Sequence, residues 1–476
     1  MATRTPQAQT RSQYTPYWGV YATAGDLPNV AGAAVQDSDL EVGDDAYVIE
    51  AGLRYVCTTA TLGAAQWSAM GLVNANFDAF GRLRVSNPQT IFDSKLVYDE
   101  QPLYWSENLT GGSTSFYDQP NAQMILSTGG GAGQAIRQTR RFFNYQPGKS
   151  QLIFQTFNAN GVESGIIKRI GYFDSTDGIF FELDGTTILG SGLSFVRRSS
   201  GANPTDSVPQ ASWNLDTLDG SGGPSNPSGL NVKSNAVQIL VIDFEWLGVG
   251  SARVGFVIDG QIVYAHRFDC ANIQQSVYMQ SPNLPLRYEL DAPSVASSGT
   301  LDCICGTVIS EGGQGATGTP FGFDSPRSAN VANNASTTLL SIRHRAGFER
   351  ITIIPTNVAP LTAGNGASTW ELLYNPTFPT PPAWGLATVR GFCELDAPSV
   401  GVADGQATPG SGTVIASGVF SNGAPAVPLD LRSTTLTLGA DVLPVVPVSD
   451  VISLVVTNRS GGNEQYLAAI NWIALT

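Results

Sequence analysis

Short apolar runs with a period of two constrain the fold of this chain more than any other feature. Residues 237–246 and 252–259 are rich in β-branched and aromatic residues, and they are separated by a turn that contains glycine. A third run, residues 261–268, comes directly after the pair Asp259-Gly260. Asp-Gly is favoured in two-residue hairpin turns, and alternating runs are typical of half-buried strands. The three runs therefore predict an antiparallel meander.

The same pattern recurs along much of the chain. It is found in residues 151–157, 178–183 and 191–197, whereas no stretch longer than two helical turns shows a capped amphipathic stripe. Gly (52) and Pro (28) supply turns, and a hydrophobic content of 42% is enough for packed cores. We therefore expect an all-β protein, an antiparallel β-sandwich of the jelly-roll or concanavalin-like type with a small N-terminal β module.

The length of the chain predicts several packed units. A chain of 476 residues is too long for one compact core. Changes in composition mark where the units begin and end. The predicted parts are a polar N-terminal tail (1–16), a small β module (17–72), a connector (73–88), a main β-sandwich domain (89–310), and a second β domain or continuation of the sandwich (311–476).

One heptapeptide, Glu-Leu-Asp-Ala-Pro-Ser-Val, occurs twice, at residues 289–295 and 394–400. Each copy is followed by a similar strand, at residues 306–310 and 412–417. Two copies are fewer than a repeat array needs. Two interpretations remain open: related strand-and-turn elements in neighbouring sheets of one sandwich, or a duplicated domain.

The chain carries few charges, and their balance is acidic. Charged residues make up 13%, about half the share of an ordinary soluble domain, and the net charge is −14. The few lysines are scattered, so we expect no nucleic-acid partner. Residues 1–13 do not resemble a signal peptide, and no apolar run approaches the roughly 18 residues that cross a bilayer. We expect folding in a cytoplasm and no membrane partner.

The five cysteines predict neither a disulfide framework nor a zinc site. Their number is odd, and no pair of CxxC motifs occurs. In a regular strand, Cys303 and Cys305 would point to the same face. We expect all five thiols to be reduced: Cys57, Cys270, Cys303, Cys305 and Cys393.

The sequence does not predict an enzyme. The two histidines, His266 and His344, lie in strand-like runs, and neither is near a GxSxG elbow. Glycine-rich stretches lack the Lys-Ser/Thr of a phosphate-binding loop. Asp174 and Asp177 could supply oxygen ligands to calcium, but a plain turn is the favoured interpretation. We therefore expect no catalytic residue, no metal site and no cofactor.

A segment near the N-terminus, residues 42–57 with Trp67 after it, resembles the small β modules of phage fibres and the chitin-binding modules of hydrolases. The resemblance implies that Tyr47, Tyr55 and Trp67 stack on sugar rings, because a pyranose face packs well on a flat aromatic ring. The alternative is that these aromatic residues form the core of the small module.

A second resemblance spans roughly residues 74 to 350. Residues 76–85, with 103–105 and 281–288 further on, look like a group of virion-associated proteins of tailed phages and some large viruses. The turn and strand at residues 259–264 are similar to the middle strands of concanavalin-like sandwiches. The first likeness implies a location in the virus particle, assembled in the host cytoplasm, with the major capsid protein or tail proteins as partners.

These observations lead to three expected functions. The first is a non-catalytic structural protein of a virus particle, which decorates the capsid or forms a head fibre or spike. The alternative is a receptor-binding adhesin of the tail that holds host glycans, and the second alternative is a glycan-cleaving tailspike. Because lysine rarely protects strand edges here, we also expect a homo-oligomer, with a trimer as the favoured state.

Overall fold

The computed structural model describes two β sandwiches and a small N-terminal sheet. Within residues 1–86 it describes Leu27 and four strands, and then residues 87–475 except for 187–190, 202–203, 295–296, 314, 316–317, 391, 399–403, 422–426, 429–439 and 442–447. The tail predicted for residues 1–16 and most of the connector predicted for residues 73–88 lie outside the described residues. The N-terminal sheet has the order β1 (Tyr17–Tyr21), β2 (Asp45–Val48), β3 (Leu53–Thr59) and β4 (Gln66–Ala69).

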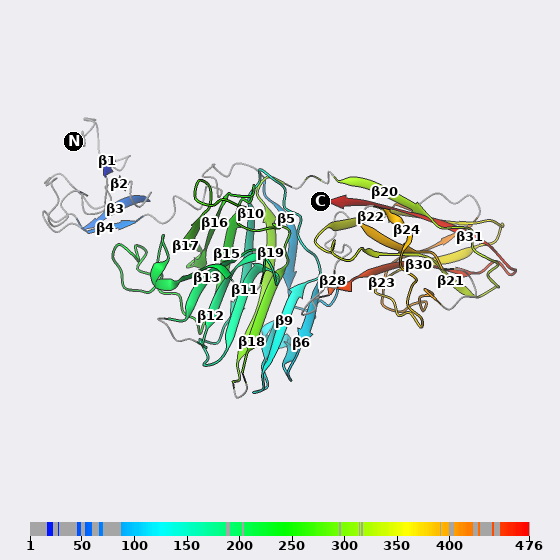
Figure 1. The fold of residues 1–476 in the computed structure, drawn as a ribbon, viewed down its shortest axis with the longest axis horizontal. Helices are drawn as coiled ribbons and strands as arrows, with labels where there is room; N and C mark the ends of the chain where they lie inside the picture. Colours follow the sequence, from blue (N-terminus) through cyan, green and yellow to red (C-terminus); the bar gives the residue numbers. More distant parts are fainter. Residues whose placement is uncertain are drawn as a thin grey trace.

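The first sandwich pairs an eight-stranded with a seven-stranded antiparallel sheet (Figure 1). The eight-stranded sheet runs β17 (Gln261–Asp269), β16 (Ser251–Ile258), β15 (Val237–Phe244), β10 (Gln151–Asn158), β19 (Thr300–Ser310), β8 (Gln123–Ser127) and β7 (Thr114–Asp118), with β5 (Gln89–Lys95) also beside β19. The seven-stranded sheet runs β14 (Pro204–Pro209), β13 (Leu193–Arg198), β12 (Gly178–Asp184), β11 (Ile167–Phe173), β18 (Leu286–Ala292), β9 (Gly133–Thr139) and β6 (Trp105–Leu109).

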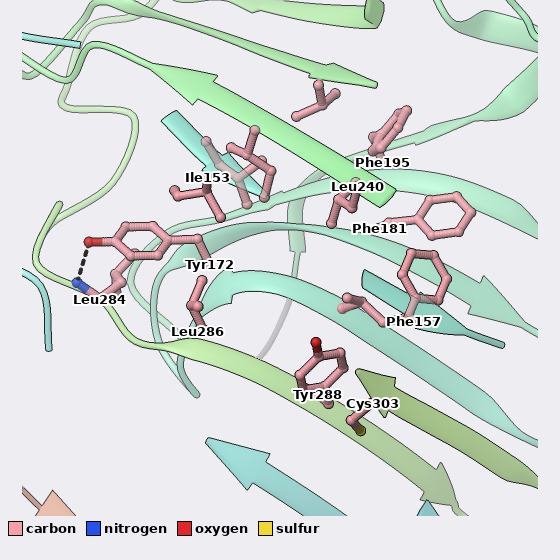
Figure 2. Packing of buried hydrophobic residues seen from close by; sticks show 14 of the residues in the cluster. Ile153, Phe157, Tyr172, Phe181, Phe195, Leu240, Leu284, Leu286, Tyr288 and Cys303 are labelled. Carbon is pink, nitrogen blue, oxygen red and sulfur yellow. Dashed lines mark hydrogen bonds between the residues drawn. The ribbon is translucent and has the colours of Figure 1, made fainter. Parts of the chain in front are cut away.

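The core of the first sandwich lies between these two sheets. Alternate residues of each strand point inward, so Phe157 of the eight-stranded sheet meets Phe181 of the seven-stranded sheet, with ring centroids 6.0 Å apart. Figure 2 shows this packing and also the hydroxyl of Tyr172, which accepts the Leu284 N–H at 3.1 Å. The polar tip of a fully buried tyrosine is thereby satisfied.

The second sandwich is smaller and packs around Trp370 and Trp472. The first sandwich also contains two short 3-10 turns, η2 (Gln119–Asn121) and η3 (Gln210–Ser212).

The four-stranded sheet of the second sandwich runs β20 (Thr319–Asp324), β31 (Tyr466–Leu475), β22 (Thr352–Thr362) and β27 (Val427–Pro428). Its six-stranded sheet runs β24 (Leu386–Arg390), β25 (Cys393–Asp396), β21 (Ser336–His344), β30 (Val451–Asn458), β23 (Ser368–Tyr374) and β26 (Thr413–Phe420), and β28 (Ala440–Asp441) pairs with β29 (Val448–Ser449).

The predicted all-β, antiparallel sandwich fold is confirmed. The described part of the chain contains no α-helix. It therefore has no helix that is long and apolar enough to span a membrane. The meander predicted for residues 237–268 is present as β15, β16 and β17, in which each strand pairs with the next.

Two ion-pair clusters join the sandwiches. Arg350, just before β22 of the second sandwich, ion-pairs with Asp174 and donates to Asp177 Oδ2 at 3.0 Å. Asp177 is fully buried, and its other oxygen accepts the N–H of Gln280 at 2.8 Å. Separating the two sandwiches would leave a buried carboxylate without its arginine partner, so this cluster opposes their separation.

The second cluster lies on the β6 side of the first sandwich. Arg140 donates to Asp450 Oδ1 at 2.9 Å, and its Nε donates to the carbonyl of Pro102 at 2.8 Å. Leu103 packs against the core of the second sandwich. Arg140 thus forms hydrogen bonds in both sandwiches. The joint between the sandwiches also contains an apolar contact, made by Leu103.

The two copies of the heptapeptide lie in different sandwiches, so they do not occupy neighbouring sheets of one sandwich. The first copy begins in β18, between β11 and β9, and the second begins in β25, between β24 and β21. The next strand crosses to the opposite sheet in the first sandwich, as β19, but stays in the same sheet in the second, as β26. The surrounding strand order is therefore not duplicated.

Cys303 and Cys305 lie on opposite faces of β19, and the prediction that they share a face was wrong. A β-bulge opposite Thr156 and Phe157 inserts one extra residue between the two cysteines. Cys303 is therefore buried in the core, whereas Cys305 is partly exposed on the outer face. All five cysteines are free thiols, and Cys57, Cys270 and Cys393 are also buried.

Candidate functional site

A polar pocket opens at one edge of the first sandwich, where β14 and β17 end the seven-stranded and eight-stranded sheets. Its volume is 450 Å³. The opposite edge, at β6, contacts the second sandwich, so the pocket lies at the far side from the joint (Figure 1). The lining side chains are contributed by β14, β17 and the segment after β17: Asp206, Ser207, Val208, His266, Arg267, Phe268, Asp269, Cys270 and Gln274.

A β-bulge in β17 directs His266 into this pocket. Val254 pairs with His266, but the next residue, Gly255, pairs with Tyr264, so Ala265 is the extra residue of the bulge. In a regular strand His266 would share the outer face with Tyr264. The bulge instead places His266 on the same side as core residue Phe268, at the open edge between the two sheets.

His266 supplies a hydrogen-bond donor to the pocket. Its ring is nine-tenths buried and lies edge-on to Phe268, with ring centroids 4.6 Å apart. Burial lowers the pKa of His266 to about 4, so the imidazole is neutral at physiological pH. Its Nδ1 accepts the Asn214 N–H at 3.3 Å, which places the hydrogen on Nε2. Nε2 has no hydrogen-bond partner among the described residues.

Arginines balance the two carboxylates of the pocket. Buried Arg197 ion-pairs with Asp206, and its Nη1 donates to the Tyr278 carbonyl at 2.6 Å. Arg267 pairs with Asp269 at 2.8 Å, and both side chains are nearly half exposed. Carboxylate oxygens have several lone pairs, so Asp206 and Asp269 can accept further hydrogen bonds. The pocket therefore offers donors and acceptors without a net charge.

The structure places the predicted sugar-stacking residues in the N-terminal sheet, away from this pocket in the sequence. Tyr47 lies in β2 and pairs with Arg54, and Tyr55 lies in β3 and pairs with Ala69 of β4. Trp67 pairs with Cys57, which is buried. The side chains of these three aromatic residues are outside the described part of the structure, so their role stays a prediction.

Asp174 and Asp177 form a turn, as the favoured interpretation predicted. Asp174 Oδ1 accepts the N–H groups of Thr176 at 2.8 Å and of Asp177 at 2.9 Å. The cation that faces these two carboxylates is the guanidinium of Arg350. Among the described residues, no three His, Cys, Asp or Glu side chains gather as metal ligands.

Carboxylates also line the outer face of the seven-stranded sheet. Arg169 of β11 is bound by Glu182 of β12 at 2.7 Å and by Glu289 of β18 at 2.5 Å. Burial would raise the pKa of Glu289, but Arg287 and Arg169 outweigh it and lower this pKa to about 2. Glu289 is 3% exposed. A sealed carboxylate with two arginine partners suits a structural role better than proton transfer to a substrate.

His344 is a structural residue of the second sandwich. It is buried, its Nε2 lies 2.7 Å from the carbonyl of Ile351, and its Nδ1 lies 3.3 Å from the hydroxyl of Ser449. Both ring nitrogens are therefore engaged, which agrees with the prediction of an ordinary strand residue.

Sequence reasoning missed the pocket. It treated His266 as an ordinary strand residue, and it did not single out Asp206, Asp269 or Gln274. The pocket depends on pairing β14 with β13 and on a bulge in β17, and neither has a signature in the alternating pattern. The one available signal is the polar end of the run, His-Arg-Phe-Asp at residues 266–269.

No protein-family model and no curated protein matches this chain. Among solved structures, it is similar to peanut lectin crystallised with a 9mer peptide, with 12% identity, a TM-score of 0.29, and coverage of 47% of this chain and 98% of the lectin. The carbohydrate recognition domain of Emp47p has 11% identity, a TM-score of 0.30, and coverage of 47% and 97%.

A glycoside hydrolase family protein from Mycobacterium thermorestibile has 10% identity and a TM-score of 0.31, and the match covers 46% of this chain and 99% of that protein. These structures carry names of sugar-binding and of sugar-cleaving proteins. At such identities and TM-scores they do not decide between the two activities, and the function has to be inferred from the residues of this chain.

Proposed function

We propose that this chain is a non-catalytic component of a virus particle that binds neutral glycans in the edge pocket of its first sandwich. The observation that carries the glycan proposal is the neutral, nine-tenths buried His266, which lines a pocket with carboxylate and amide acceptors and whose Nε2–H has no hydrogen-bond partner among the described residues. The particle location is supported by the resemblance of residues 76–85, 103–105 and 281–288 to virion-associated proteins.

The chemistry of the pocket matches sugar hydroxyl groups. Each hydroxyl both donates and accepts, so it can donate to Asp206 or Asp269 while it accepts from Arg267 or from His266 Nε2. Phe268 and the His266 ring provide an apolar surface beside these groups. Hydrogen bonds to charged groups are stronger than those between neutral groups, so Asp206, Asp269 and Arg267 are strong partners for sugar hydroxyls.

The charge balance of the pocket favours a neutral sugar over an acidic one. Arg197 neutralises Asp206, Arg267 neutralises Asp269, and His266 carries no charge above about pH 4. An anion would therefore meet two carboxylates without an unpaired cation among the lining residues. A single site of this kind binds weakly, but many copies on one particle would raise the avidity.

The experiment is a glycan array probed with the full-length protein, followed by calorimetric titration with the best neutral oligosaccharide and its sialylated counterpart. We expect the neutral sugar to bind better, and the double variant Arg267→Ala/Gln274→Ala to lose about tenfold in affinity. Arg459→Ala is the matched control, because this arginine lies in the second sandwich, where it donates to Asn334. Absence of neutral glycan binding, or equal affinity of the double variant, would refute the proposal.

A purely structural role in the particle is the second candidate, and the joint favours it. One segment of the virion-like resemblance lies there, since Leu103 packs on the second sandwich. Another, residues 281–288, begins directly after Gln280, whose N–H binds Asp177 at the joint. A stiff two-domain unit is suited to spacing or bracing other proteins. Copy number in purified particles separates the candidates, since dozens of copies or more indicate a decoration protein and a few indicate an adhesin.

A further inference from the structure

The outer face of the eight-stranded sheet carries a contiguous apolar surface, which we call the back face. It contains a groove of 400 Å³ over the middle of the sheet. The groove and its surroundings are lined mainly by partly exposed apolar and small side chains: Phe154, Thr156, Ile239, Val257, Cys305 and Thr307. Contiguous apolar surface of this kind, unlike a single exposed leucine, marks a binding surface.

The other outer face of the same sandwich is built differently. There, Phe173 and Phe180 lie beneath the guanidinium of Arg198, at 5.9 and 4.9 Å from their ring centroids. Arg169, Glu182 and Glu289 continue this cover as ion pairs. The seven-stranded sheet therefore covers its outer aromatic residues with its own charged side chains. On the back face, Arg253 likewise lies over the Tyr264 ring and pairs with Asp243. In the middle of that sheet, however, Phe154, Ile239 and Val257 stay partly exposed.

Two edge strands of the eight-stranded sheet, β5 and β17, are partly occupied within the chain. On β5, Arg141 donates to the carbonyl of Ile91 at 3.0 Å and Gln101 donates to that of Lys95 at 3.0 Å. On β17, Asn214 exchanges two hydrogen bonds with the backbone of Arg267. Edge pairing, on which the expectation of an oligomer depended, is thus partly blocked at β5 and β17, and the open face offers another surface for association.

Two opposite charges flank the back face on one strand. Asp93 and Lys95 are both exposed, and neither forms an ion pair or a side-chain hydrogen bond with another described residue. They belong to two adjacent rows of the sheet: Asp93 pairs with Thr307 and Thr307 with Phe154, whereas Lys95 pairs with Cys305 and Cys305 with Thr156.

We propose that a second copy of this chain packs on the back face, related by a twofold axis that crosses the strands at the level of Ser94. Such an axis lies between the eight-stranded sheets of the two copies, and it places each row of one copy opposite the other row of the second copy. Asp93 then faces Lys95 of the second copy, and Phe154 faces Thr156 of the second copy, so that a large side chain meets a small one. The surface is therefore complementary to itself in both charge and size.

A twofold dimer differs from the trimer that we favoured on the basis of the sequence. The pairing uses only residues of the first sandwich, and it leaves the edge pocket open. It does not depend on the proposed glycan binding, because none of the residues Asp93, Lys95, Phe154 or Thr156 lines that pocket.

The test is sedimentation velocity of the full-length chain over a range of concentrations, with charge reversals at the rim. We expect the mass to approach twice the 50.2 kDa of one chain. Asp93→Lys and Lys95→Asp should each weaken the dimer about tenfold, and the double reversal should restore it. Arg459→Asp, a charge reversal in the second sandwich, is the matched control and should have no effect.

A second variant tests the apolar part of the face. Thr156→Arg places a long cation in the groove and should give a monomer, with an unchanged circular dichroism spectrum as the check on folding. The proposal is overturned by a monomer at all concentrations, by a trimer, or by a dimer that does not respond to any of the three rim variants. Failure of Thr156→Arg to fold leaves the rim reversals as the deciding measurement.

Discussion

The two copies of the heptapeptide bury the same leucine but differ in how far they bury the glutamate before it. In both copies the leucine, Leu290 or Leu395, is fully buried in the core of its sandwich. The glutamates differ: Glu289 is 4% exposed by its side chain, whereas Glu394 is 24% exposed. Identical sequence has therefore produced the same strand alternation but not the same burial of the outward-facing acid.

Neighbouring strands cause this difference. Glu289 lies between Arg287 on its own strand and Arg169 on β11, and both guanidinium groups bind it. Among the described residues, Glu394 ion-pairs with Arg343 on β21, and that guanidinium lies 4.4 Å from the centroid of the half-buried Trp384 ring. The period-two pattern thus decides which side a residue faces, and the strands beside it decide what it meets there.

The largest expected effect on stability is at Glu289, the buried glutamate of the first heptapeptide copy. Glu289→Gln would leave Arg287 without its carboxylate partner in a buried site, and we expect a loss of about 3 kcal/mol in the free energy of unfolding. The pKa of Glu289 is lowered from 4.5 to about 2, so its contribution is present above pH 4.5 and is lost as the pH falls toward 2. Urea denaturation at pH 7 and at pH 3 measures both effects. A loss below about 1 kcal/mol at pH 7 would show that the two arginines do not depend on Glu289.

The next effect concerns the joint between the sandwiches. Arg350→Met would leave Asp177, which is fully buried, with backbone N–H donors but no cation, at a cost of about 2 kcal/mol. We expect the second sandwich to unfold or detach before the first, which limited proteolysis and two-step melting would reveal. A single cooperative transition at the wild-type temperature would contradict an essential role for this pair.

Much of the fold could be predicted from the sequence, because alternation and Asp-Gly turns are local signals. Residues 237–268 illustrate this, since the predicted meander is present as three paired strands. The bulges were not predictable. Each adds one residue without a sequence signature and reverses the side that the later residues of its strand face, which moved His266 into the pocket and separated Cys305 from Cys303.

Long-range partners were also beyond the sequence. Asp174 and Asp177 looked like a turn or a calcium loop, and nothing local indicated that Arg350, far along the chain, would face them. The pocket has the same origin, because Asp206 and Asp269 are brought together by edge strands of two different sheets. The sequence therefore predicts local turns and strands, but it does not predict which distant residues meet in the fold.

A smaller effect on stability is expected at Glu394, the more exposed glutamate of the second heptapeptide copy. Glu394→Gln removes an ion pair with Arg343 whose side chains are 24% and 32% exposed, and water can replace much of the lost interaction. We expect a change of at most about 0.5 kcal/mol by the same urea denaturation. The pair Glu289→Gln and Glu394→Gln is matched in residue type and in sequence context. Equal losses in both variants would show that burial does not explain the difference between the copies.

The smallest effect, and one of opposite sign, is expected at the aspartate of the second copy. Asp396 is 2% exposed, its Oδ2 is buried without a hydrogen-bond partner among the described residues, and burial raises its pKa. A raised pKa means that the charged form is disfavoured in the folded state, so Asp396 supports folding below its unfolded pKa and opposes it at neutral pH.

Asp396→Asn removes this charge while it keeps an oxygen that can accept the N–H groups bound by the carboxylate. The new amide nitrogen lacks a partner, which limits the gain, and we expect about 0.5 kcal/mol of added stability at pH 7. At pH 3 the wild-type carboxyl is largely neutral, so the gain should vanish. Urea denaturation at both pH values measures the difference. A variant that is less stable than wild type at pH 7 would show that the charged Asp396 is better solvated than its burial indicates.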